Sequence, residues 1–230
     1  MSKAETEESR KRWEENAAFW DAAMGDASNE FHRRAVSPKV TELLQPEKGD
    51  YILDIACGNG NYSVYLAAKG IRVTAFDYSE KMIALAKKRQ AAYPDRIEFC
   101  VADATSRQSM MALRREHPYT KAVSNMAIMD IADIRPLFEA VHDLLVEHGI
   151  FVFSTQHPCF VTRTDKYMTA HSYEGEAILG QPQKQLYFHR SLQDLFNVCF
   201  DTGFVIDGFA ETCWKNQEIP EVIIVRARKK

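Results

Sequence analysis

A short apolar run that ends in a glycine-rich turn constrains this chain more than any other feature. Residues 51–60 read YILDIACGNG, so an apolar strand leads directly into a turn that holds two glycines. Gly58 and Gly60 lack a Cβ atom, so the backbone there can take positive φ and let a ligand approach the main chain. The run predicts a strand–turn–helix unit with a ligand site at the turn.

From residue 51 onward, strand-like apolar runs alternate with helix-like segments. This alternation is typical of an α/β protein with a mostly parallel sheet and helices on both of its faces. The expected strands span residues 51–55, 72–76, 97–102, 121–125, 150–155, 205–210 and 222–227. The expected helices span residues 62–69, 79–92, 110–115, 133–147 and 191–202. Because the last two strands are joined by a short connection, we expect them to form an antiparallel hairpin.

Charge and cysteine content argue against several classes of protein. The net charge of -3 and a pI near 6.2 give no general attraction to nucleic acid, so we expect no nucleic-acid partner. The five cysteines are widely spaced without a C-x-x-C pair, which predicts neither a disulfide framework nor a metal site. The charged amino terminus and the lack of an apolar run of about 18 residues predict a cytoplasmic protein without a membrane partner. The sequence does not predict the oligomeric state.

The glycine-rich turn also carries an acid and a small residue at regular spacing. The alternate positions are Asp54, Ala56, Gly58 and Gly60. This pattern resembles the first motif of the class I S-adenosylmethionine-dependent methyltransferases, and among them the small-molecule enzymes of types 11 and 25. Ala56 stands where that motif has a glycine, so we expect the backbone there to give up positive φ. The NAD-binding pattern G-x-G-x-x-G is incomplete, because Ser63 takes the place of its third glycine.

The resemblance implies a Rossmann-like fold of seven strands, S-adenosyl-L-methionine as cofactor and S-adenosyl-L-homocysteine as product. Ligands of such folds bind at the carboxyl ends of the strands. Asp77 ends the second strand, and its two oxygens would accept both ribose hydroxyls, while Asp103 after the third strand would accept from the adenine amino group. The predicted cofactor-binding residues are Trp20, Asp54, Ala56, Cys57, Gly58, Gly60, Asp77, Tyr78, Met82, Asp103, Ala104, Asn125 and Met126.

The acceptor side is expected in the segment after the fifth strand, where residues 156–184 show no regular pattern. A long irregular excursion at the ligand edge of a sheet is usually functional. His157 and His189 are the candidate general bases, with His171 behind them. The candidate substrate-binding residues are Phe160, Tyr167, Tyr173 and Tyr187. We therefore expect a small-molecule methyl acceptor.

The amino-terminal segment carries Trp13, Ala17, Trp20 and Met24 at helical spacing. This stripe predicts a helix that docks on the sheet edge, closes as a lid over the cofactor, or does both. An aromatic face near the sulfonium would gain cation–π attraction. We expect one domain with four parts: an amino-terminal helical lid over 1–45, a cofactor-binding core over 46–156, a substrate-side insertion over 157–184, and carboxyl-terminal strands and helix over 185–230.

Two other functions remain open from the sequence. An NAD-dependent oxidoreductase would share the strand–turn–helix beginning, but it would leave Asp54, Asp103 and the terminal hairpin unexplained. A non-catalytic S-adenosylmethionine-binding protein would hold the same cofactor without turning it over. The polar and aromatic segment after the fifth strand favours an enzyme with a substrate pocket.

Overall fold

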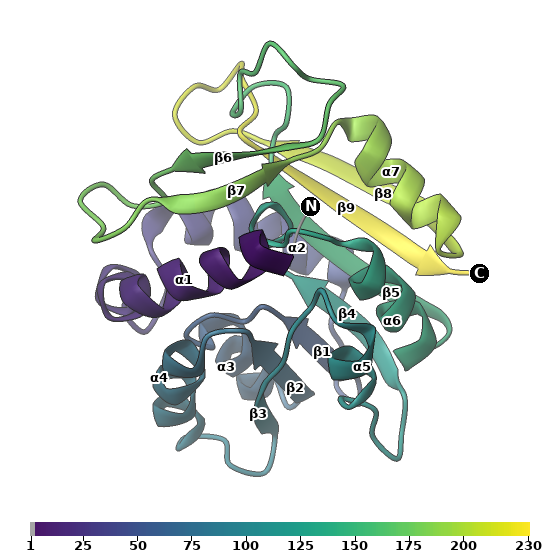
Figure 1. Ribbon diagram of the computed structural model, residues 1–230. Coiled ribbons are helices and arrows are strands. Elements are labelled where there is room, and N and C mark those ends of the chain that lie inside the picture. The colour runs from purple at the N-terminus through teal and green to yellow at the C-terminus, as the bar shows by residue number, and fades with distance from the viewer. Residues whose placement is uncertain (1–2) are drawn as a thin grey trace.

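The computed structural model describes residues 3–230 and contains a seven-stranded sheet between two layers of helices (Figure 1). The strands are β1 (Tyr51–Ile55), β2 (Arg72–Asp77), β3 (Ile97–Val101), β4 (Tyr119–Ser124), β5 (Leu145–Gln156), β8 (Phe204–Thr212) and β9 (Val222–Lys229). They lie in the order β3-β2-β1-β4-β5-β9-β8, and β9 runs antiparallel to both of its neighbours. The predicted mostly parallel sheet with an antiparallel carboxyl-terminal hairpin is therefore confirmed.

Two hydrophobic cores hold the helices against the sheet. One core joins it to α2 (Ser37–Leu44), α3 (Asn61–Ala68) and α4 (Glu80–Gln90). The other joins it to α5 (Arg107–Met111), α6 (Arg135–Leu144) and α7 (Leu192–Asp201). Because side chains alternate across a strand, Ile52 of β1 packs in the first core and Leu53 in the second. All five residues of β1 are consequently buried.

Side-chain caps fix where two of the helices begin. The Ser79 hydroxyl accepts a hydrogen bond from the Met82 amide at 3.1 Å and caps α4, as predicted. Ser191 accepts from the Asp194 amide at 3.1 Å, and the Asp194 carboxylate accepts from the Ser191 amide at 3.3 Å. This capping box begins α7, so the sequence signals for both starts are satisfied locally.

Two predicted helices have different bounds in the structure. The helix expected over 133–147 ends at Leu144, because Leu145 already pairs with Tyr119 as the first residue of β5. The register between β4 and β5 is irregular after this pair, and His148 has φ of 62°. Because of this irregularity, the start of β5 lacks the regular side-chain alternation by which a strand is recognised in a sequence. The helix expected over 110–115 is instead α5, which begins after the Ser106 cap.

The segment after β5 is more regular than predicted. It contains β6 (His171–Gly175), which pairs antiparallel with β7 (Gln185–His189) in a separate two-stranded sheet. Four of the five residues of β6 are partly buried and one is exposed, so its sequence has no apolar alternation to read. The expectation of an irregular segment throughout 156–184 is therefore wrong.

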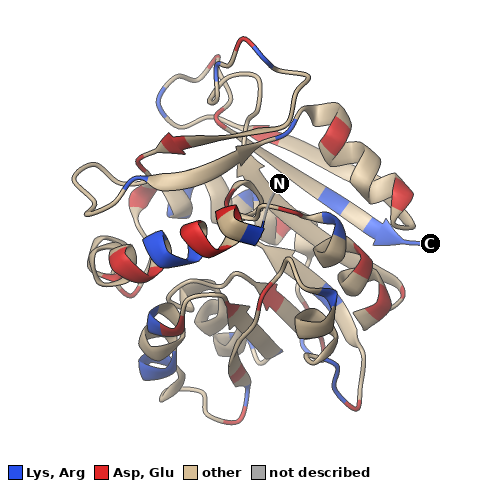
Figure 2. Ribbon diagram, in the orientation of Figure 1, with Lys and Arg blue, Asp and Glu red and all other residues tan. Residues whose placement is uncertain are grey.

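The amino-terminal α1 (Lys3–Met24) lies between this hairpin and the carboxyl ends of the central strands (Figure 1). It contacts β7 on one side and α4 on the other. Acidic and basic residues alternate along it (Figure 2). A short π-helix, η1 (His32–Val36), leads on to α2. Within residues 3–230, no helix has the length and apolar character needed to cross a membrane.

We expect Gly60→Ala to lower the free energy of unfolding by about 3 kcal/mol, since positive φ and crowding both oppose a side chain there. Gly60 has φ of 79°, and a Cβ atom at this position would lie 2.7 Å from Cζ of Phe99. Gly70→Ala is the matched control, because Gly70 has φ of 86° but its Cβ would meet no atom closer than 3.9 Å. We expect that control to lose only about 1–2 kcal/mol in urea denaturation. Equal losses of stability in the two variants would contradict the expected crowding between the new Cβ atom and Phe99.

Candidate active site

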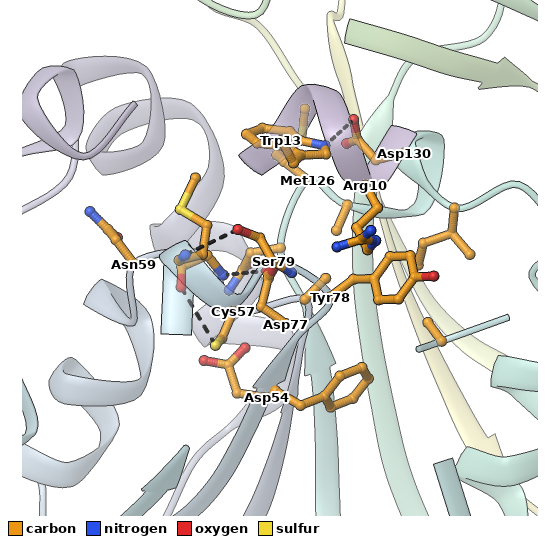
Figure 3. Close-up of a pocket in the computed structure, with 18 of the residues that line it drawn as sticks. Arg10, Trp13, Asp54, Cys57, Asn59, Asp77, Tyr78, Ser79, Met126 and Asp130 are labelled. Carbon is orange, nitrogen blue, oxygen red and sulfur yellow. Dashed lines mark hydrogen bonds between the residues drawn. The ribbon is translucent and has the colours of Figure 1, made fainter. Parts of the chain in front are cut away.

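A pocket lies where the carboxyl ends of β1, β2, β3 and β4 meet α1 (Figure 3). It holds about 1120 Å³ of empty space, its open mouth included. All of the predicted cofactor-binding residues except Gly60 line it.

Asp54, the last residue but one of β1, lies at the bottom of the pocket (Figure 3). Its side chain is buried, and its carboxylate accepts a hydrogen bond from the Ser63 hydroxyl at 2.6 Å. Burial raises the pKa of Asp54 to about 7, because the charged form loses its hydration and Ser63 offsets only part of that loss. Among the described residues, no Lys or Arg forms an ion pair with this carboxylate. The site therefore holds an acid that lacks a cationic partner.

Asp77 links the turn after β1 to the turn after β2. One carboxylate oxygen accepts from the Gly58 amide at 2.9 Å, and the other accepts from the Ser79 amide at 2.9 Å. Burial raises its pKa to about 6 despite these two hydrogen bonds. Each oxygen has a further lone pair, so the carboxylate can also accept from a ligand in the pocket.

Asp103 follows β3 and shapes the next turn. Its Oδ1 accepts from the Thr105 amide at 2.8 Å and from the Thr105 hydroxyl at 2.7 Å. Ala104 lines the pocket beside it, and Tyr78 and Met82 line the pocket from the turn after β2 and from α4. Acids from three successive strand ends thus surround one cavity.

The glycine-rich turn differs from the expectation at two positions. Ala56 has φ of 51°, so the backbone keeps the left-handed conformation that the alanine was expected to abandon. An alanine in that region costs about 1–2 kcal/mol, which the surrounding turn must offset. Gly60 packs against Phe99 outside the pocket lining. Gly58, with φ of 54°, faces open space, as a close approach of a ligand to the backbone requires. Cys57 also lines the pocket, and burial raises the pKa of its thiol.

The segment after β4 forms another wall. Met126 has φ of 51°, and its amide donates to the Ser154 hydroxyl at 2.9 Å. The side-chain nitrogen and oxygen of Asn125 are buried and find no hydrogen-bond partner within residues 3–230. A buried amide without partners is costly, so Asn125 fits a pocket whose ligand supplies a donor or an acceptor.

Helix α1 covers the pocket and is bonded to both sides of it. Trp13 and Trp20 line the pocket with their rings edge to face, 5.1 Å between centroids, and Met24 lines it one turn later. Ala17 is buried and does not line it. Asp21 accepts from the Asn59 side chain at 2.9 Å on the strand side. On the hairpin side, the Asn16 side chain donates to the carbonyl oxygen of Gln183 at 2.7 Å.

The candidate general bases lie elsewhere. His157 does not line the pocket, because its Nε2 hydrogen-bonds Glu211 at 2.7 Å and its Nδ1 accepts from the Cys159 amide at 3.2 Å. His189 borders a separate, smaller cavity of about 270 Å³. Its Nε2 donates to the carbonyl oxygen of Tyr167 at 2.8 Å, while Nδ1 is buried without a partner among the described residues. Burial lowers the pKa of His189.

The predicted substrate-binding aromatic residues are dispersed. Tyr173 borders the smaller cavity, and its hydroxyl donates to Oε1 of Gln156 at 2.7 Å. Phe160 is exposed, Tyr187 is buried, and the Tyr167 hydroxyl accepts from the Leu192 amide at 2.9 Å. None of these three borders either cavity. The structure therefore does not bring the four residues together.

Several pocket residues were not predicted from the sequence. They include Thr6, Ser9 and Arg10 of α1, and Asp130, Ile131 and Ala132. The last three lie in a loop, residues 128–132, that begins with the 3-10 helix η2 (Ile128–Asp130). Buried Arg190 holds this loop, because its guanidinium donates to the carbonyl oxygens of Ile128 at 3.2 Å and Ala132 at 2.7 Å. A search for polar residues a few positions beyond β4 would have found Asp130. Within residues 3–230, no cluster of three or more His, Cys, Asp or Glu side chains is placed to hold a metal ion.

Comparisons with known proteins agree with this geometry. Residues 52–149 match a family model described as a methyltransferase domain. The chain has the class I methyltransferase fold. A crystal structure of an S-adenosylmethionine dependent methyltransferase from Mesorhizobium loti is similar to it, with 26% identity and a TM-score of 0.63 over 84% of this chain and 96% of that one. A magnesium protoporphyrin IX methyltransferase from Synechocystis with bound SAH shares the fold at 18% identity, with a TM-score of 0.69 over 98% of this chain and 100% of that one.

Sequence relatives of the methyltransferase domain act on different acceptors. A demethylmenaquinone methyltransferase from Clavibacter sepedonicus is 46% identical over 29% of this chain and 26% of its own length. A 23S rRNA (uracil(1939)-C(5))-methyltransferase from Acidithiobacillus ferrooxidans is 33% identical over 34% of this chain and 18% of its own length. The chain spans between 18% and 56% of the length of the first curated relatives that it matches.

We expect the ionisation of Asp54 to destabilise the unliganded methyltransferase domain as the pH rises from about 4 to about 7. The folded-state pKa is raised to about 7 from 3.8, so in this range the folded protein retains a proton that unfolding releases, and a higher pH favours unfolding. Asp54→Asn lacks this ionisation, so its stability relative to the wild type should increase with pH, by at most about 1.4 kcal/mol per unit of pKa difference. Thermal denaturation of both proteins at several pH values measures this difference. A difference that does not change with pH would contradict the expectation.

Proposed function

We propose that the protein is an S-adenosylmethionine-dependent methyltransferase that transfers a methyl group to a small-molecule acceptor. The observation that carries this proposal is the meeting of Asp54, Asp77 and Asp103 around one pocket beside the open face of Gly58. Three acids at three successive strand ends suit a ligand with an ammonium group, a ribose and an adenine.

Each acid receives one part of the cofactor in this proposal. Asp54 lies deepest, and its charge would be offset by the ammonium group, since no Lys or Arg among the described residues pairs with it. Asp77 would accept the ribose hydroxyls, and Asp103 with Ala104 would receive the adenine. The unpartnered side chain of Asn125 supports a polar ligand at the same edge.

When bound, S-adenosylmethionine supplies a methyl group activated by a sulfonium charge. The chain itself orients the two reactants and excludes water, and such proximity is worth up to about 7–11 kcal/mol in well-oriented systems. Trp13 and Trp20 of α1 cover the pocket, and their rings can stabilise a nearby cation. We propose that residues 1–45 act as a lid for this reason.

Two observations favour a small acceptor. The pocket is covered by α1, which is bonded to the β6–β7 hairpin through Asn16 and through an Arg12–Glu174 ion pair of 2.7 Å. Along the ribbon in Figure 2, Lys and Arg are interspersed with Asp and Glu, whereas nucleic-acid binding typically uses clustered positive charge. Among the relatives, a demethylmenaquinone methyltransferase and a 23S rRNA methyltransferase bear the names of two different acceptors.

The charge of the pocket argues against the NAD alternative. A dinucleotide would bring its pyrophosphate to the glycine-rich turn, where the carboxyl groups of buried Asp54 and partly buried Asp77 lie. Like charges in a poorly solvated site repel strongly. A non-catalytic binding protein would have no use for the pocket volume beyond the cofactor, and that volume continues along residues 126–132.

Isothermal titration calorimetry with S-adenosylmethionine and S-adenosylhomocysteine tests the proposed cofactor. We expect both compounds to bind the wild type. Asp77→Asn should lower both affinities at least tenfold, because the substitution removes the charge that receives the ribose hydroxyls. Asp95→Asn is the matched control, since Asp95 is exposed and lies outside the pocket. Circular dichroism verifies that each variant is folded. A folded wild type that binds NADH but neither adenosyl compound would contradict the proposal and support the oxidoreductase.

A further inference from the structure

The pocket continues past the strand-end acids into a second half, beyond the contacts proposed for Asp54, Asp77 and Asp103. The loop after β4 and the first three turns of α1 form this half. Its lining is Thr6, Ser9, Trp13, Met126, Ala127 and Ile131. Two charged side chains, Arg10 and Asp130, stand among these mostly neutral neighbours (Figure 3). This half is where a second reactant has room.

The carboxyl group of Asp130 is hydrogen-bonded to α1 through one of its two oxygens. The Trp13 indole nitrogen donates to Oδ1 at 3.2 Å, and the Ser9 hydroxyl donates to the main-chain oxygen of Asp130 at 3.2 Å. No described residue donates a hydrogen bond to Oδ2. Figure 3 shows the carboxyl group beside the Trp13 ring, at the edge of the pocket opposite Asp54. One acceptor oxygen is therefore available to a molecule in the pocket.

The carboxyl group also lacks a cationic partner. Arg10 lines the same pocket, but it pairs with Glu7 and lies 5.6 Å from the centre of the Tyr78 ring. None of the ion pairs within residues 3–230 includes Asp130. Burial raises its pKa well above the usual value for an aspartate. An enclosed acid of this kind is costly unless a hydrogen-bond donor or a cation compensates it.

We propose that Asp130 binds the nucleophilic group of the methyl acceptor, and that this group is an amine or a hydroxyl that carries its own proton. The inference rests on the proposed function and names the substrate class of the same site. An N–H or O–H group would donate to Oδ2, and the apolar neighbours Ala127 and Ile131 would contact the carbon skeleton. A free carboxylate acceptor would instead bring a second negative charge to Asp130.

Binding of three adenosyl compounds tests this inference without knowledge of the acceptor. S-adenosylhomocysteine has no charge at sulfur, S-adenosylmethionine has a sulfonium without N–H donors, and sinefungin has an amine at the position of the methyl group. We expect Asp130→Asn to lower the affinity for sinefungin at least tenfold in calorimetry. The affinities for the other two compounds should change by less than threefold. The asparagine retains an acceptor oxygen for the Trp13 indole.

Two further variants serve as controls. Asp133→Asn removes a nearby exposed acid and should leave all three affinities unchanged. Asp130→Ser repeats the comparison with a smaller side chain if Asp130→Asn does not fold. Equal losses of affinity for sinefungin and for S-adenosylmethionine would make Asp130 a partner of the sulfonium and overturn the inference. Unchanged sinefungin binding, or an equal loss of S-adenosylhomocysteine, would also overturn it. A wild type that binds none of the three would overturn the proposed function as well.

Discussion

The carboxylate of Asp77 joins the two turns on which the pocket depends. It accepts from the amide of Gly58 in the turn after β1 and from the amide of Ser79 at the start of α4. These bonds hold both turns open toward the same space while Asp54 and Asp103 approach it from the neighbouring strands. The parallel sheet makes this possible, because its strands all present their carboxyl ends at one edge. The hydrogen bonds also fix the orientation of the carboxylate that the proposed ribose would meet.

The burial of acids without cationic partners is the electrostatic counterpart of this arrangement. Burial raises the pKa of Asp54 to about 7 and that of Asp77 to about 6, so the unliganded pocket is a poor environment for negative charge. A ligand with positive charge and hydroxyl donors would stabilise the ionised acids, whereas a dinucleotide would add to the repulsion. The same reasoning extends to Asp130 in the other half of the pocket. The charge of the pocket thus favours a cationic ligand over a dinucleotide, although the backbone of the glycine-rich turn could accommodate either.

Local sequence signals predicted the fold well because they act over short distances. Strands buried between two helical layers give continuous apolar runs, as in residues 222–225. The Ser79 and Ser191 hydroxyls cap their helices by accepting from the amides three residues later. The hairpin of β6 and β7 was missed because β6 is only partly buried and its pairing is non-local. Ala56 could not be anticipated, since its positive φ is imposed by the turn around it.

Site residues that follow strand ends could be predicted from the sequence. Site residues whose positions are set by contacts between distant segments could not. Strand-end rules led to Asp54, Asp77 and Asp103, and the structure brings their side chains into one pocket. The same rules cannot foresee that Glu211 of β8 engages His157, or that α1 brings Trp13 to Asp130. Residues far apart in the sequence make those contacts, and no local pattern records them. Roles inferred for isolated histidines therefore had the weakest physical basis.

A crystal structure of the protein with S-adenosylhomocysteine would show which groups hold the cofactor. We expect the ribose hydroxyls at the Asp77 carboxylate, the adenine beside Asp103 and Ala104, and the amino-acid portion over Gly58 toward Asp54. The sulfur would then point toward the half of the pocket that contains Asp130. A ligand bound outside this pocket, or a ribose held by groups other than Asp77, would contradict the proposed cofactor site.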